Sequence, residues 1–170
     1  ALQLNRHFAL SLVLDNLPDS NYRGDTRVEQ GTLVVTGHLT STRVLVGADG
    51  VLTGRGAVWQ EIHNAGRLET DADNRLLAAG DYTQAATGTL SVQVGREFMV
   101  HGTATIEGGS LHVSGIAPGY VAQATEPVIT ALQGLSGRFD TLSHAAGLFL
   151  DAELAYDYEN FRVNLEIERL

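Results

Sequence analysis

A short phrase recurs along this chain: a glycine, one variable residue, a leucine and then a run of strand-forming residues. It occurs in EQGTLVVTG (29–37), GADGVLTGRG (47–56), HNAGRLETD (63–71), ATGTLSVQVG (86–95) and EGGSLHVSG (107–115). Successive phrases lie roughly 16 to 24 residues apart, which is the spacing of solenoid coils. A coil this short cannot bury its own apolar side chains, so coils must stack to form one core. The repeat therefore predicts a parallel β-helix.

The repeat also predicts which side chains face inward. A jelly roll or β-sandwich would give short strands too, but it predicts no recurring glycine–x–leucine phrase. No segment of a dozen residues has helical periodicity, so we expect an all-β fold. The expected core consists of Leu33, Val35, Val44, Val46, Val51, Leu68, Leu90, Val92, Leu111 and Val113.

The last stretch, LDAELAYDYENFRVNLEIERL (150–170), alternates apolar and polar residues on both sides of Glu159 and Asn160. This pattern predicts a long antiparallel hairpin with one buried face. Such a hairpin could cap the open end of a solenoid. We therefore expect one domain over 1–170, with β-helix coils in 1–137 and a hairpin cap in 138–170. The predicted buried face of the cap consists of Tyr156, Tyr158, Phe161, Val163, Leu165 and Ile167.

The charge of the chain excludes some classes of partner. The formal net charge is −9, and the basic residues are eleven arginines with no lysine. Such a surface repels phosphate backbones and anionic lipids, so we expect no nucleic-acid partner. The chain has no cysteine, which excludes a disulfide scaffold and cysteine-ligated zinc. We expect an acidic, soluble monomer.

Histidine is the first candidate for chemistry. His101-Gly102-Thr103 resembles the phrase that holds the catalytic histidine of subtilisin-like proteases, but no serine here lies in the helix start that such a triad needs. No two histidines have the three- or four-residue spacing of a helical metal-ligand pair. We therefore expect no catalytic residue, cofactor or metal site at the histidines, which are His7, His38, His63, His101, His112 and His144.

Paired carboxylates are the second candidate, because β-helices also carry glycan-cleaving enzymes. Asp71 and Asp73 lie in a turn-rich stretch, and Asp151 and Glu153 precede the hairpin. No aromatic platform for a sugar ring accompanies either pair. The segment DADN (71–74) also lacks the glycine and distal glutamate of a known calcium loop. We expect these carboxylates to be solvated.

Arg23-Gly24-Asp25 is the tripeptide that many adhesive proteins present to receptors. The alternative is a turn in which Gly24 supplies backbone freedom and Asp25 caps the next strand. We favour the turn at Gly24.

Several phrases in order resemble one family. LSLVLDNLPDSNYRGDTRVEQGTLVVTG (10–37) is similar to the passenger-associated transport repeat of bacterial autotransporters, and LAAGDYTQAATGTLSVQVG (77–95) is similar to the C-terminal region of their passengers. HGTATIEGGSLHVSG (101–115) and the hairpin continue the resemblance across essentially the whole chain.

The resemblance implies a function in folding. It implies the autochaperone region of a passenger in type V secretion, a right-handed β-helix that folds first and templates the rest outside the outer membrane. Its partners would be the remainder of its own passenger and a C-terminal outer-membrane barrel, at the cell surface of a Gram-negative bacterium or released from it. The parent would be a virulence factor of the subtilisin-like serine protease type, and this segment would not be catalytic. The alternative is an adhesin-type module that contacts host surfaces weakly through its loops.

Overall fold

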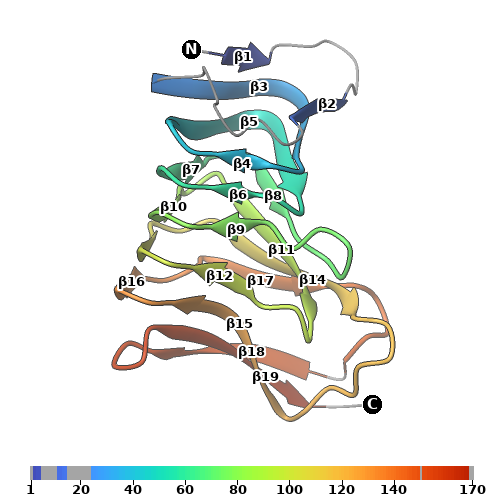
Figure 1. The fold of residues 1–170 in the computed structure, drawn as a ribbon. Coiled ribbons are helices and arrows are strands. Elements are labelled where there is room, and N and C mark those ends of the chain that lie inside the picture. Colours follow the sequence, from blue (N-terminus) through green and yellow to red (C-terminus); the bar gives the residue numbers. More distant parts are fainter. Residues whose placement is uncertain (1, 5–10, 15–23, 150, 169–170) are drawn as a thin grey trace.

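The computed structural model describes residues 2–4, 11–14, 24–149 and 151–168, and all its regular elements are β-strands. The strands wind into coils that stack from the N-terminal to the C-terminal end (Figure 1). They are β1 (Leu2–Leu4), β2 (Ser11–Leu14), β3 (Gly24–Val35), β4 (His38–Leu39), β5 (Thr42–Gly54), β6 (Ala57–Val58), β7 (Ile62–Asn64), β8 (Arg67–Glu69), β9 (Leu77–Ala78), β10 (Tyr82–Gln84), β11 (Thr89–Val94), β12 (Phe98–Val100), β13 (Thr103–Ile106), β14 (Ser110–Ile116), β15 (Thr125–Ala131), β16 (Gly134–Gly137), β17 (Thr141–His144), β18 (Asp151–Asp157) and β19 (Arg162–Glu168).

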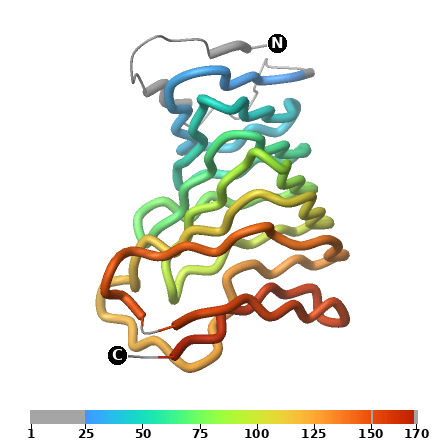
Figure 2. The backbone as a smooth tube through the Cα atoms, turned by 180° about the vertical axis from the view of Figure 1, so that it is seen from behind, coloured from blue at the N-terminus to red at the C-terminus, as the bar shows by residue number. Residues whose placement is uncertain are grey.

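The strands form a 12-stranded and a 7-stranded sheet. The larger sheet follows the order β16-β13-β10-β7-β5-β8-β11-β14-β17, with β3 beside β5 and with β1 and β2 beside β3. It has two arms because the long strand β5 bends and pairs with β7 along its first part and with β8 along its last part. The smaller sheet follows the order β18-β19-β15-β12-β9-β6-β4. Successive coils add strands to both arms and to the second sheet, as the backbone trace shows from behind (Figure 2), which confirms the predicted β-helix.

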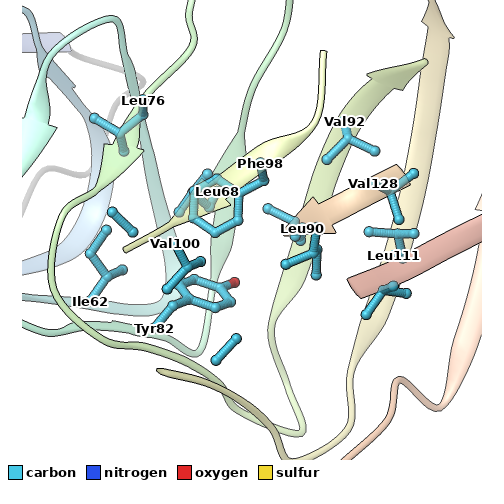
Figure 3. Close-up of a cluster of buried hydrophobic side chains, with 14 of the residues drawn as sticks. Ile62, Leu68, Leu76, Tyr82, Leu90, Val92, Phe98, Val100, Leu111 and Val128 are labelled. Atoms are coloured by element: carbon cyan, nitrogen blue, oxygen red, sulfur yellow. The ribbon is translucent and has the colours of Figure 1, made fainter. Parts of the chain in front are cut away.

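The leucines of the recurring phrase form a ladder through the core. In the backbone register, consecutive members of the series Leu33, Leu52, Leu68, Leu90 and Leu111 lie opposite one another, and all are fully buried. Three of these leucines lie among the core side chains of Figure 3. The prediction of Val51 as a core residue is wrong, because Val51 is only half-buried and Leu52 is the one that continues the ladder. The other predicted core residues are buried.

The glycine of the phrase is needed because coils approach closely at the corner. A Cβ atom on Gly88 would lie 2.3 Å from the carbonyl oxygen of Asn64 in the preceding coil. A Cβ on Gly109 would lie 2.3 Å from the carbonyl oxygen of Gly88, and Gly109 also has a positive φ of 77°. Any larger residue would push the coils apart, so glycine fixes their stacking distance at this corner.

The predicted hairpin is formed by β18 and β19, which pair antiparallel from Asp151↔Glu168 to Asp157↔Arg162. It begins later than expected. Residues 141–144 form β17, which still pairs parallel with β14, so the stacked coils extend beyond the predicted boundary at 137. The hairpin then extends the second sheet through an antiparallel pairing of β19 with β15.

The buried face of the hairpin agrees with prediction along β19 and departs from it at the turn. Val163 and Leu165 are fully buried and Ile167 is 9% exposed. Phe161 lies in the turn with a φ of 59° and is partly buried against the core. Tyr158 is 46% exposed and is not part of the buried face. The reason is that the turn occupies residues 158–161, which interrupts the strict alternation assumed from the sequence.

Candidate functional site

The C-terminal cap is built on the pairing between β19 and β15. Val163 lies opposite Ile129 in this antiparallel pair, and alternate residues of β19 face the core, which buries Val163 and Leu165. Backbone hydrogen bonds continue beyond the paired residues, where Ala131 and Ile167 donate their N–H groups across the pair. The strand β19 thereby satisfies the edge of β15 that the next coil would otherwise occupy.

Two tyrosines of the hairpin, Tyr156 and Tyr158, attach it to the last coil. Their rings stack with centroids 5.7 Å apart and an interplanar angle of 9°. The Tyr158 hydroxyl donates to the carbonyl oxygen of Gly137 (2.7 Å), and the Phe139 N–H donates to the Tyr156 hydroxyl (3.0 Å). The Arg138 guanidinium lies 5.6 Å from the centroid of the Tyr156 ring, a cation–π contact. We call these five residues the tyrosine clamp; they fix the corner between β16 and β17 to the cap.

A buried carboxyl group lies at the start of β15, opposite Leu165 of β19. Glu126 is 3% exposed, and its two oxygens accept hydrogen bonds from the Tyr120 hydroxyl (2.7 and 2.8 Å). The Gln123 N–H also donates to Glu126 (2.7 Å). The hydrogen bond to Glu126, with burial, raises the pKa of Tyr120. A buried carboxyl group is costly unless it is hydrogen-bonded, so these contacts fix the loop 117–124 against the start of β15.

The two ends of the stack differ in strand direction. Within the described ranges, the antiparallel strand pairs are β15 with β19 and β18 with β19, both at the C-terminal end. At the N-terminal end, β1 and β2 both run parallel to β3. At the C-terminal end, a reversed strand thus follows the last coil in the smaller sheet, whereas the N-terminal end keeps the direction in which coils repeat.

The structure places part of the adhesion-type tripeptide in a strand. Gly24, expected in a turn, is the first residue of β3 and pairs with Thr42; Arg23 lies outside the described residues. Asp25 does not cap a strand but bridges coils, because its carboxylate accepts from Arg43 (2.8 Å) and contacts Arg27 (3.3 Å). The Asp25 side chain is 20% exposed, so most of it is covered.

The histidines of the described ranges do not assemble into a site, and His7 lies outside those ranges. His101 is exposed at the turn between β12 and β13, and its ring makes no hydrogen bond to a serine or a carboxylate in the described part of the chain. His112 accepts from or donates to Ser143 (2.8 Å), and burial, with Arg67 and His144 nearby, lowers its pKa. Among the residues that the structure describes, no group of three or more histidine, aspartate or glutamate side chains could hold a metal ion.

The paired carboxylates have separate roles. Asp71 closes its own turn, because one of its oxygens accepts from the N–H groups of Asp73 and Asn74 (2.9 Å each). Asp151 and Glu153 lie on β18, directly opposite Glu168 and Glu166 of β19. Like charges facing each other across strands weaken the pairing, so the free end of the hairpin carries two such repulsive pairs.

A polar cluster in the core was missed by sequence reasoning. The Asn64 amide donates to the Tyr82 hydroxyl (3.1 Å) and to the Thr89 carbonyl oxygen (2.9 Å), and its oxygen accepts from Gly66 N–H (3.1 Å). Tyr82 donates in turn to Gln84. Burial raises the pKa of Tyr82, whose ring lies in the core in Figure 3. Aligning coils by register would have revealed the pair, since Asn64 lies opposite Gln84.

Comparison with models of known protein families and with curated proteins gave no match for this chain. In the part of the chain that the structure describes, there is no helix long and apolar enough to cross a membrane.

Proposed function

We propose that this domain is an autochaperone segment: it folds by itself, closes its own C-terminal end and offers its N-terminal coils as a template for chain that precedes it. The observation that carries the proposal is the difference between the two ends. A coil can add to a parallel edge by repeating the existing register, whereas at the C-terminal end the reversed strand β19 occupies the edge of β15 in the smaller sheet.

The energetics of a solenoid support this role. In stacked coils, stability comes from each coil's contact with its neighbour, so the first folded coil lacks a partner on one side. Here β19 supplies that partner by burying Val163 and Leu165 against β15. Burial of each new coil then provides the driving force for the next, with no external energy source.

The resemblance to autotransporter passengers supplies the setting for the proposal. The partner is the rest of the same passenger at the bacterial surface, and the domain itself has no catalytic role.

The substitution Leu165→Asp tests whether the capped domain acts as a folding template. The change places a carboxylate at a fully buried position, which costs several kcal/mol. In the secreted parent protein, we expect chain preceding the domain to become protease-sensitive, while the parent is still exported. Glu166→Gln is the control, since the amide oxygen can still accept from the Thr125 hydroxyl.

A second measurement separates loss of the template from loss of export. The wild-type domain is added to cells that carry the Leu165→Asp parent, and protease resistance is measured again. Partial recovery is expected, because the template acts by contact. A protease-resistant passenger in Leu165→Asp without any addition would overturn the proposal.

A further inference from the structure

A groove runs along one corner of the β-helix, where the second sheet passes into the first arm of the larger sheet. It is lined by Arg43 of β5 and by residues of the turns that follow β6, β9, β12 and β15, which belong to successive coils. Since parallel strands stack about 4.8 Å apart, the groove is roughly 15 Å long. Its lining residues are Arg43, Trp59, Gln60, Glu61, Ala79, Gly80, Asp81, Gly102 and Gln133.

Trp59 forms an exposed aromatic wall of this groove. The residue is 51% exposed, so one face of a large aromatic ring is open to a ligand. The indole is nevertheless held in place: its N–H donates to Nδ1 of His38 (3.0 Å), and the two rings lie 6.0 Å apart. The ring is therefore positioned before any ligand arrives, which lowers the entropy cost of binding.

The groove is open beside Trp59 because glycines, Gly80 and Gly102, line it in the next two coils. A Cβ on Gly80 would lie 2.8 Å from the carbonyl oxygens of Trp59 and Gln60. A Cβ on Gly102 would lie 2.1 Å from a carboxylate oxygen of Asp81, and that oxygen accepts from the Thr103 N–H (2.8 Å). Bare backbone at these positions thus keeps the Asp81 carboxylate beside the hollow.

The polar groups of the groove are mostly acceptors and amides. Glu61 and Asp81 supply carboxylates, while Gln60 and Gln133 are exposed amides. The one cation in the lining, Arg43, already contacts Glu61 (3.9 Å) and the more closely bound Asp25 (2.8 Å). Its charge is therefore offset, and an anionic ligand such as a phosphate would meet net negative charge.

We propose that this corner groove binds a neutral oligosaccharide, with the apolar face of one sugar ring on the Trp59 indole and its hydroxyls donating to Asp81 and Glu61. A flat aromatic face beside acceptors and amides matches a ligand that has an apolar ring face and hydroxyls at its rim. A cationic peptide would also find an indole, but Arg43 already pairs with Glu61, which leaves Asp81 as the one uncompensated carboxylate of the lining. The groove lining contains none of the clamp residues, and the proposed binding is independent of the template function.

The test uses the chain as it is. The purified protein is applied to a printed array of neutral, sialylated and sulfated oligosaccharides, and then titrated with the strongest neutral binder. Trp59 is the single tryptophan, so a change in tryptophan fluorescence reports on this groove alone. We expect binding of neutral glycans, weak or no binding of the acidic ones, and a saturable fluorescence change.

Variants locate the site by calorimetry. Trp59→Ala and Gln133→Ala change exposed side chains, so both should fold; we expect at least tenfold weaker binding for the first and a smaller loss for the second. Val121→Ala, at an exposed apolar residue outside the groove lining, is the matched control and should bind like the wild type. No bound neutral glycan, equal binding by Trp59→Ala, or tighter binding of an arginine-rich peptide would each overturn the proposal.

Discussion

At the scale of single residues, position in the coil decides what a side chain contributes. Val51 and Leu52 are neighbours on β5, yet only Leu52 lies in the ladder with Leu33 and Leu68. The sequence phrase contained this information, because the leucine always follows the glycine by two residues. Val51 was predicted to be buried because its side chain is apolar. Neighbouring side chains of a strand point to opposite faces, so Val51 lies outside the core when Leu52 lies in it.

A pair of alanine substitutions measures this difference. Leu68→Ala removes a fully buried side chain from the ladder, and we expect a loss of about 2–5 kcal/mol in the free energy of unfolding. Val51→Ala, at a half-buried position, should cost less than about 1 kcal/mol. Urea denaturation of both variants checks the prediction, which equal losses would contradict.

The buried Asn64 gives a second prediction. Asn64→Leu preserves the approximate volume but leaves the Gly66 N–H and the Thr89 carbonyl without this partner. Each buried polar group left unsatisfied costs about 1–3 kcal/mol, so we expect a loss of roughly 3 kcal/mol or more. His63→Leu, on the same strand and only half-buried, is the control and should lie within about 0.5 kcal/mol of the wild type. An unchanged urea midpoint for Asn64→Leu would show that the polar cluster is dispensable.

At the scale of elements, the hairpin acts through both its strands and its turn. The buried strand β19 was predictable, because alternation over seven residues fixes a face. The tyrosine clamp was not predictable. Tyr158 reaches the Gly137 carbonyl oxygen because it lies in the turn and not in the strand. Contacts set by turn geometry, like the corner groove made from separate coils, depend on loop conformations that local patterns do not encode.

Amide exchange tests the clamp. Tyr156→Phe removes the hydroxyl that accepts from the Phe139 N–H while keeping the ring that stacks on Tyr158. We expect faster hydrogen exchange at the Phe139 amide and a loss of about 0.5–1.5 kcal/mol in stability. Amides in β11, distant in sequence from the clamp, provide the internal reference. If the Phe139 amide exchanged at its original rate, the hydroxyl would have no part in holding the corner.

At the scale of the whole molecule, the repeated phrase was sufficient to predict the β-helix, since each phrase places one leucine in one coil. Two further features escaped prediction. The Asn64–Gln84 pair was hidden because turns of unequal length separate successive phrases. The position of Gly24 was missed because the tripeptide was interpreted as a turn, whereas long-range pairing with β5 makes it a strand residue.

Stability should fall at alkaline pH. Burial raises the pKa of Tyr82 and Tyr156, and the hydrogen bond to Glu126 raises that of Tyr120. The unfolded chain, with tyrosine pKa values near about 10, therefore loses protons before the folded one. The stability that these tyrosines contribute is fully present below about pH 10 and is lost as the pH rises above that value. Urea midpoints at several pH values from about 8 upward check this, with Tyr82→Phe expected to show a shallower decline; a midpoint that stays constant would contradict it.

The register between Asn64 and Gln84 has a mechanical consequence. These opposed residues are 20 positions apart, and a fully extended segment of that length spans up to roughly 70 Å. Once wound into a coil, the same segment advances the stack by only about 4.8 Å. Each winding step therefore takes up more than ten times as much contour as it adds in height. A chain held at a distant point would be drawn taut as it winds, so that the free energy of folding performs work along the tether.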